Sequence, residues 1–322
     1  MKKDITQLDD IKLLVNTFYD KVREDDLLKD IFNEVIQDKW SIHLEKMYRF
    51  WETVLLENHT YYGGPFAPHA KLPVTKEHFD RWKLLFFQTL LKQGVCLTTS
   101  SGVHAVPIAQ TVMLYLLSLT RDLPGWLQDQ SNRVWNPRSI GALQGLKTAV
   151  LGMGPIGYEI SRLCLAMRMD PVAFRRTVRG DEPCITHELA EIDSHLPDMD
   201  VIILALPLAP ETDGILNASR LARLKPGVLI VNIGRGACID EEALIRALHS
   251  GQVGGAGLDV FAEEPLPFDS PLWEMPNVII TPHSSGEEPG NHAQATRIFL
   301  ENAARYQRGH PLLNAVAQPE PL

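Results

Sequence analysis

Short apolar runs alternate with amphipathic stretches from about Lys147 onward, and this alternation constrains the fold more than any other feature of the chain. Each run is apolar throughout, as expected of strands buried on both faces of a sheet. We expect strands at 148–151, 172–174, 201–205, 228–233, 255–258 and 278–281, and helices at 156–166, 188–195, 218–224 and 241–250. This order is typical of a Rossmann-type α/β domain with a doubly wound parallel sheet.

The turn after the first expected strand has the glycine spacing of a phosphate-binding loop. The run LKTAVLGMGPIG holds Gly152, Gly154 and Gly157 in a G-x-G-x-x-G arrangement, with Pro155 and Ile156 opening the next helix. The first glycine permits a tight turn, the second lets the backbone approach a pyrophosphate, and the third allows close helix packing. The alternative is a glycine-rich turn without a ligand, and the flanking strand and helix favour the dinucleotide site.

The residues after the second expected strand bear on the choice between NAD and NADP. A carboxylate usually follows the glycines by about 20 residues and binds the ribose hydroxyls. This chain has Arg175 and Arg176 there instead. Because a guanidinium binds a 2′-phosphate that a carboxylate would repel, the pair favours NADP over NAD. The alternative is that both arginines are the solvated end of a strand.

Three later strands are each followed by polar side chains, at the edge where α/β sheets bind ligands. Arg235 lies in VNIGRGACID, Asp259 and Glu264 lie in GLDVFAEEP, and His283 lies in TPHSSG. Reduction of a 2-keto acid needs a cation for the substrate carboxylate and keto oxygen, and a proton donor for that oxygen. Arg235 and His283 have that chemistry, and Glu264 would favour the protonated imidazole. Singly, His283 could be a surface histidine and Glu264 a turn cap, but their joint occurrence favours catalysis.

Together these motifs resemble the ordered signatures of D-isomer-specific 2-hydroxyacid dehydrogenases. The similar runs are LGMGPIG, VNIGRGACIDEEAL, GLDVFAEEPLP and TPHSSG, within about 94–314. The resemblance implies an NAD(P)-dependent oxidoreductase of small 2-keto and 2-hydroxy acids. Arg235, Glu264 and His283 would be its catalytic residues, and Asp259 would lie near the nicotinamide. The segment SSGVHAVPIAQTVMLYLLSLTR resembles the family's long helix, which commonly packs across a homodimer axis.

The chain departs from this family in three respects. Gln110 replaces a usual Glu, and Arg168 replaces a Gly that commonly precedes the second strand. The family also normally carries an α/β substrate domain before the nucleotide-binding half, and residues 1–91 have no such pattern. We therefore expect cofactor binding with impaired turnover.

Residues 1–91 are rich in aromatic side chains and show no strand pattern. Leu13, Leu14, Phe18 and Val22 recur at helical intervals, so this part is predicted to be all-helical. It resembles a truncated haemoglobin, closest to group III of the three groups, in the runs LVNTFYDKVREDDLL, IFNEVI, HLEKMYRFWETVLL, YYGGPFAPHAKLP and HFDRWKLLF.

The globin resemblance implies a set of haem-binding residues. His69 would ligate the haem iron, and Tyr19, His43 and Trp82 would line the distal side, where dioxygen or nitric oxide binds. Considered alone, Tyr19 and Trp82 could be ordinary helical core, and His43 could be a surface histidine.

We interpret the chain as a fusion of an incomplete globin-like domain (1–91), an NAD(P)-binding domain (92–314) and a short tail (315–322). The leading hypothesis is a 2-hydroxyacid dehydrogenase. The alternatives are a haem-binding oxygen or nitric oxide protein with a nucleotide-binding appendage, and a hybrid that retains only nucleotide binding. A haem reductase is disfavoured, because nicotinamide donates a hydride, haem iron takes single electrons, and no flavin motif is present.

Composition narrows the expected partners and location. A net charge of −9 argues against a nucleic-acid-binding surface, since phosphate contacts need clustered Lys and Arg. The most apolar segment, 106–119, is too short to cross a bilayer, and the acidic start does not resemble a signal peptide. The four cysteines have no metal spacing, as in the free thiols of a reducing cytosol. A cytoplasmic protein without membrane or nucleic-acid partners is expected.

Overall fold

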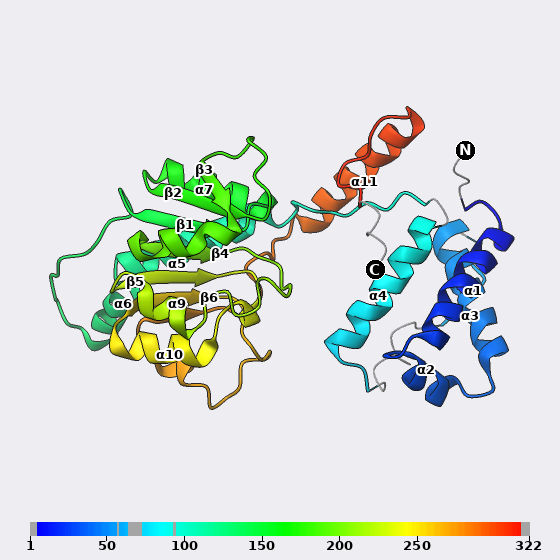
Figure 1. Cartoon of the computed structure of the whole chain (residues 1–322), viewed down its shortest axis with the longest axis horizontal. Coiled ribbons are helices and arrows are strands. Elements are labelled where there is room, and N and C mark those ends of the chain that lie inside the picture. The colour runs from blue at the N-terminus through cyan, green and yellow to red at the C-terminus, as the bar shows by residue number, and fades with distance from the viewer. Residues whose placement is uncertain (1–4, 57, 64–72, 93–94, 317–322) are drawn as a thin grey trace. The chain divides into compact units, whose positions relative to one another are not determined.

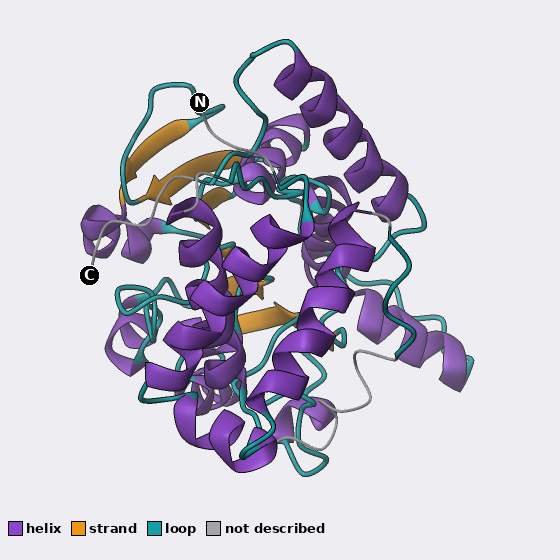
Figure 2. Ribbon diagram, turned by 90° about the vertical axis from the view of Figure 1, so that its right-hand side faces the viewer, coloured by secondary structure: helices purple, strands orange, loops and turns teal. Residues whose placement is uncertain are grey.

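The computed structural model describes residues 5–56, 58–63, 73–92 and 95–316 (Figure 1). The chain divides into two units, one formed by residues 1–99 with 300–322 and the other by residues 100–299. The seven strands of the described residues form a single sheet in the second unit, whereas the N-terminal elements are helices (Figure 2). The predicted combination of a helical N-terminal part and a parallel α/β part is therefore confirmed.

The N-terminal unit is built on the helices α1 (Leu8–Glu24), α2 (Lys29–Ile36), α3 (Trp40–Leu56) and α4 (Lys76–Lys92). A reciprocal capping box between Gln7 and Asp10 begins α1. Its buried face repeats at three- and four-residue intervals and comprises Ile11, Leu14, Val15, Phe18, Tyr19 and Val22. Leu13, which the sequence pattern included, points away from this face and is 60% exposed.

The described C-terminal residues belong to the same unit. Ala315 forms an antiparallel bridge with Thr98, and the Val316 N–H donates to the Leu97 carbonyl oxygen at 2.9 Å. The Asn314 side-chain amide also donates to the Thr99 carbonyl oxygen at 3.1 Å. Backbone pairing thus holds residues 314–316 against the segment that follows α4.

The second unit contains the strands β1 (Lys147–Leu151), β2 (Asp170–Arg175), β3 (Ile185–Glu188), β4 (Val201–Leu204), β5 (Val228–Asn232), β6 (Val253–Leu258) and β7 (Val278–Ile280). Their order in the sheet is β3-β2-β1-β4-β5-β6-β7, and all pairs are parallel. The helices are α5 (Ala105–Thr120), α6 (Leu123–Asn132), α7 (Pro155–Ala166), α8 (Ile192–His195), α9 (Ala218–Arg223) and α10 (Glu241–Ser250), and α11 (Asn291–Gln307) continues into the first unit.

Helices cover both faces of this sheet (Figure 1). Successive strand residues face opposite sides, so in β1 Ala149 and Leu151 join one core and Val150 joins the other. The first core is completed by α8, α9 and α10, and the second by α5 and α7. This double burial explains why the strands read as continuous apolar runs.

Strand β3 was not predicted. Among the described strands it pairs only with β2, at the edge of the sheet, and its sequence ITHE has a single large apolar residue, Ile185, which is 68% exposed. The helix predicted at 188–195 is instead the end of β3, a 3₁₀ turn (Leu189–Glu191) and the short helix α8. An edge strand buries little surface, so no apolar run marks it in the sequence.

Helix α5 is apolar on two sides. Ala109, Val112 and Leu116 are fully buried against the sheet, whereas Val106 and Leu114 are exposed. Among the residues that the structure describes, none of the helices combines the length and hydropathy that a bilayer crossing requires.

Candidate active site

The parallel register aligns the carboxyl ends of six strands. Partner residues form one row across the sheet: Phe174, Leu151, Leu204, Asn232, Leu258 and Ile280. Gly152, Arg175 and Asp259 directly follow members of this row, and Arg235 and His283 lie three residues beyond it. The fold therefore brings the sequence-predicted residues to one edge of the sheet, where α/β proteins bind ligands.

The glycine turn after β1 has the geometry of a phosphate-binding loop. Gly152 has a φ of +103°, and its N–H donates to the Phe174 carbonyl oxygen at 2.8 Å. A Cβ on Gly157 would lie 1.9 Å from the Gly152 carbonyl oxygen, so α7 packs on the turn at a distance that only glycine allows. A Cβ on Gly154 would meet no protein atom within 4 Å. Open space thus adjoins the first turn of α7, where backbone N–H groups have no intrahelical partner.

Arg175, at the end of β2, is already paired within the protein. Its guanidinium lies 2.7 Å from Glu182 and is only 14% exposed. Glu182 also accepts the backbone N–H groups of Arg179 at 2.8 Å and Gly180 at 2.7 Å. The Arg179 N–H, followed by the Arg175 guanidinium and the Gly180 N–H, lowers the pKa of the Glu182 carboxyl to about 2.

Arg176 has a different environment from its neighbour. Its side chain is 86% exposed, and its contact with Glu211 is a long one of 3.7 Å between two exposed groups. A solvated pair at this distance contributes little stability. Of the two arginines, Arg176 is therefore the one whose guanidinium is accessible to a ligand.

His283 and Glu264 form a pair beyond β7 and β6. The His283 Nδ1 lies 2.7 Å from the Glu264 Oε2, and the Glu264 Oε1 accepts the Phe261 N–H at 3.1 Å. His283 has a φ of +53°, in the left-handed region, so the loop turns sharply at the imidazole. A carboxylate on Nδ1 selects the tautomer with its hydrogen there, which leaves Nε2 as the atom that gains or releases a proton.

Asp259 organises the loop that carries His283. Its buried carboxylate accepts the Ser284 N–H at 2.9 Å and the Ser285 hydroxyl at 2.5 Å, and it also binds the Thr281 hydroxyl. The sequence assigned Asp259 to the cofactor, but these contacts also make it a positioning residue for His283. No local motif predicted them, because the partners lie 22 to 26 residues further along the chain.

Arg235 lies on the neighbouring loop after β5. Its guanidinium donates to the Gly234 carbonyl oxygen at 2.6 Å, and its own carbonyl oxygen accepts the Asn232 amide at 3.0 Å. A Cβ on Gly236 would lie 1.9 Å from the Phe261 carbonyl group. The arginine loop is therefore pressed against the segment that leads to Glu264, and the two loops are held together.

Tyr115 supports this site, and sequence reasoning missed it. Its hydroxyl lies 2.5 Å from the Thr281 hydroxyl, which in turn binds Asp259. Burial raises the pKa of Tyr115 to about 12. A Cβ on Gly257 would lie 2.5 Å from the tyrosine ring. The ring can therefore pack on β6 only because position 257 is glycine. A glycine inside an apolar strand was the available signal of a close neighbour.

The helical unit brings together the three residues predicted to line the distal side of a haem, Tyr19, His43 and Trp82. The rings of Tyr19 and His43 are 5.0 Å apart, edge to face, and burial raises the pKa of Tyr19 above its usual range. Trp82 packs in the same core, against Phe18 at 5.1 Å. A phenol and an imidazole among aromatic rings fit the distal side of a haem pocket. The predicted iron ligand, His69, lies outside the described residues.

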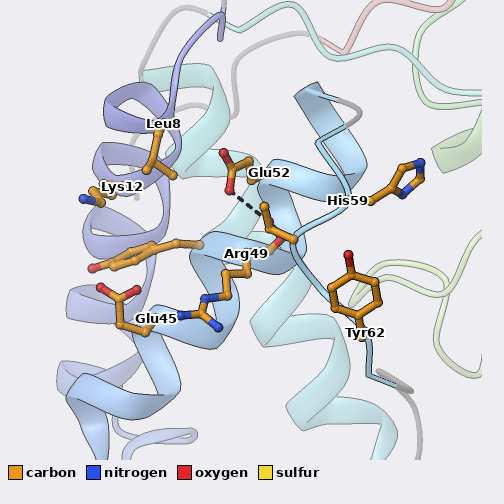
Figure 3. A pocket seen from close by; sticks show the side chains of 9 residues that line it. Leu8, Lys12, Glu45, Arg49, Glu52, His59 and Tyr62 are labelled. Atoms are coloured by element: carbon orange, nitrogen blue, oxygen red, sulfur yellow. Dashed lines mark hydrogen bonds between the residues drawn. The ribbon is translucent and has the colours of Figure 1, made fainter.

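A hollow of about 500 Å³ also lies in this unit (Figure 3). It opens between α1 and α3 and is lined by charged and polar side chains, including Lys12, Glu45, Arg49, Glu52 and His59. Glu52 accepts a hydrogen bond from the Thr60 hydroxyl at 2.9 Å within it. Its lining contains none of the three predicted distal residues, and its mixed charges do not suit a porphyrin.

Comparison with known proteins agrees with this geometry. The sheet and its glycine turn define a dinucleotide-binding domain. Residues 113–285, more than half of the chain, match the family profile described as D-isomer specific 2-hydroxyacid dehydrogenase, NAD binding domain. The chain belongs to the D-isomer specific 2-hydroxyacid dehydrogenase family.

Several relatives are dehydrogenases or reductases. A D-isomer specific 2-hydroxyacid dehydrogenase from Xanthobacter autotrophicus Py2, solved with NADPH and MES, is 34% identical, with 70% of this chain and 93% of that chain covered and a TM-score of 0.62. An NADPH-dependent glyoxylate/hydroxypyruvate reductase from Sinorhizobium meliloti, solved with NADP and sulfate, is 29% identical, with 70% and 72% covered and a TM-score of 0.62. A D-3-phosphoglycerate dehydrogenase from Archaeoglobus fulgidus is 29% identical over 231 residues, which are 71% of this chain and 44% of that protein. The chain spans less than half the length of three curated D-3-phosphoglycerate dehydrogenases that it matches, those from Archaeoglobus fulgidus, Synechocystis sp. and Bacillus subtilis.

The N-terminal part matches a second family. Residues 4–106 match the profile described as Bacterial-like globin. The chain therefore carries a bacterial-like globin domain ahead of the dehydrogenase nucleotide-binding domain, as the two sequence resemblances predicted.

Proposed function

We propose that the chain is an NADP(H)-linked oxidoreductase that interconverts small 2-keto and 2-hydroxy acids. The observation that carries the proposal is the 2.7 Å pair of His283 and Glu264, at the same sheet edge as the glycine turn. A nicotinamide, when bound, supplies or accepts the hydride at the carbonyl carbon. The test is oxidation of NADPH by 2-keto acids and its loss in a His283→Ala variant.

The residues of the chain have separate roles in this proposal. Arg235 holds the substrate carboxylate and polarises the keto oxygen. The His283 Nε2 gives its proton to that oxygen during reduction and takes it back during oxidation, so the hydride and the proton together convert the ketone to the alcohol. Glu264 stabilises the imidazolium through Nδ1, and Asp259 holds the loop that presents the ring.

The cofactor preference is proposed to depend on Arg176. Arg176→Ala should weaken NADPH binding about 10- to 100-fold and leave NADH binding unchanged, because one guanidinium–phosphate contact contributes about 1.5–3 kcal/mol. Arg175→Ala should have the smaller effect on NADPH, since Arg175 is already neutralised by Glu182. Dissociation constants measured by nucleotide fluorescence test both expectations.

The Arg176 experiment has a clear contrary result. Equal dissociation constants of the wild-type chain for NADPH and NADH would mean that neither arginine meets a 2′-phosphate. A larger loss in Arg175→Ala than in Arg176→Ala would mean that Arg175 leaves Glu182 to bind the ligand.

A second candidate function is haem binding by the globin domain, which the match over 4–106 and the pairing of Tyr19 with His43 favour. His69→Ala should abolish or markedly shift the Soret band of the reconstituted protein, because an imidazole is the axial ligand of globin iron. His43→Ala should retain the band and change the affinity for dioxygen or nitric oxide. If His43→Ala abolished the Soret band and His69→Ala retained it, His43 would be the iron ligand and His69 would lie on the distal side.

A homodimer through α5 is also proposed. The exposed side chains of Val106, Leu114 and Leu117 form an apolar strip on this helix, as expected of a surface that a second copy covers. Leu114→Asp should shift the sedimentation coefficient from that of a dimer to that of a monomer. A monomeric wild-type chain would contradict the proposal.

A further inference from the structure

Three potential metal ligands to which no role is assigned above lie together at the edge of the sheet. They are His187, Glu191 and His195, and one ligand atom from each lies within 4.8 Å of the other two. His187 belongs to β3, Glu191 ends the 3₁₀ turn, and His195 ends α8. The three residues are four positions apart in the sequence, and the strand, the turn and the helix together bring their ligand atoms to one place.

A backbone hydrogen bond orients the carboxylate of this cluster. The Glu191 Oε1 accepts the Glu188 N–H at 3.1 Å, while its Oε2 lies 3.7 Å from the His187 Nδ1. One oxygen thus anchors the side chain to the backbone and the other faces an imidazole. Hydrogen bonds of this kind orient the ligands in metal sites.

The two imidazoles are also fixed by packing. Their ring centroids are 4.3 Å apart, and both rings contact Phe174, His187 at 5.9 Å and His195 at 5.4 Å. Phe174 is fully buried in the core of the sheet, so it provides a rigid support. The imidazoles therefore pay little conformational entropy when they share a ligand.

We infer that His187, Glu191 and His195 bind a divalent transition-metal ion, with Zn²⁺ as the representative. Two imidazole nitrogens and one carboxylate oxygen suit this class of ion, whereas Mg²⁺ and Ca²⁺ prefer oxygen ligands alone. Ligand bonds of about 2.0–2.2 Å put neighbouring donor atoms of a tetrahedral ion about 3.4 Å apart. The ligand atoms are at most 4.8 Å apart, and His187 Nδ1 is already 3.7 Å from Glu191 Oε2, so small side-chain movements reach this spacing, and Glu191, at 52% exposure, has room to move.

The ion would link the edge strand to the helix that follows it. In the part of the chain that the structure describes, β3 pairs with β2 alone, through four register partners. An ion bound by β3, the 3₁₀ turn and α8 cross-links these three elements, and a ligand that binds only the folded chain stabilises it. The site also adjoins β2, the strand that ends at Arg175, since Glu188 is the register partner of Arg175.

The inference is tested by titrating Zn²⁺ into the full-length, chelator-treated chain in a calorimeter. The wild type should bind one Zn²⁺ at this site. The variants His187→Ala, His195→Ala and Glu191→Gln should either lose that Zn²⁺ or bind it at least about 10-fold more weakly. Glu191→Gln is the sharpest variant, because it keeps the side-chain size and an acceptor for the Glu188 N–H. Zn²⁺ should also raise the thermal midpoint of the wild type and leave that of the variants unchanged.

The matched control is His249→Ala, which removes an exposed histidine from α10 in the same unit. It should bind Zn²⁺ as the wild type does, which separates this site from other histidines among the 11 in the chain. Identical isotherms for the wild type and the double variant His187→Ala/His195→Ala would overturn the inference. So would a loss of Zn²⁺ binding in His249→Ala equal to that in Glu191→Gln.

Discussion

Gly157→Ala is expected to destabilise the α/β unit by at least about 3 kcal/mol and to abolish NADPH binding. The added Cβ would lie 1.9 Å from the Gly152 carbonyl oxygen, and neither atom can rotate away, because the backbone of Gly157 fixes the Cβ and the oxygen is itself a backbone atom. Relief requires α7 to move off β1 by more than 1 Å, which opens the close-packed core around Val150 and Ile160. Chemical denaturation of the variant and a nucleotide titration measure the two effects.

Gly154→Ala is the matched control for this prediction. Its Cβ would meet no protein atom within 4 Å, and the backbone, with φ of −83°, accepts any residue. The free energy of unfolding should therefore change by less than about 1 kcal/mol. NADPH binding should still weaken at least about 10-fold, because the methyl group enters the space proposed for the pyrophosphate. Unchanged NADPH affinity in Gly154→Ala would show that the phosphates do not bind at this turn.

The sequence predicts those features of the fold and the site that are set by residues close together in the chain or by the parallel arrangement of the strands. Three glycines within six positions define the glycine turn, and the buried strands are apolar runs, so the sequence alone predicts both. The pairing of His283 with Glu264 was predicted as well, because parallel strands must deliver both loops to one edge.

Features that depend on distant or weak contacts were not predicted. The neutralisation of Arg175 by Glu182 arises from the shape of the loop after β2, not from a pattern. The chain of hydrogen bonds from Tyr115 through Thr281 to Asp259 joins residues up to 166 positions apart. β3 was missed because an edge strand with polar side chains has no apolar signature.

Turnover of small 2-keto acids by this 322-residue chain is expected to be weak, with kcat/KM below about 10⁴ M⁻¹s⁻¹. The groups for proton transfer are in place, and such transfer contributes about 10²–10⁴-fold. However, the dehydrogenase family normally closes its substrate site with a second α/β domain, and the described residues of this chain form a single sheet. A substrate site that no opposing domain closes orients the keto acid poorly and does not exclude water, and orientation alone can lower a barrier by several kcal/mol.

The measurement is a steady-state assay with NADPH and a panel that includes glyoxylate and hydroxypyruvate, on the wild type, His283→Ala and Glu264→Gln. His283→Ala should lower kcat by a further 10²–10⁴-fold, about the whole contribution of general acid catalysis, with NADPH affinity unchanged. Glu264→Gln should lower it less, because the amide still accepts a hydrogen bond from Nδ1 but no longer stabilises the imidazolium. A wild-type kcat/KM of about 10⁴ M⁻¹s⁻¹ or more would mean that the globin domain, or a second copy of the chain, supplies an opposing wall to the substrate site. If that activity survived in His283→Ala, the proton would come from another group, and the proposed reaction centre would be wrong even though the cofactor site stands.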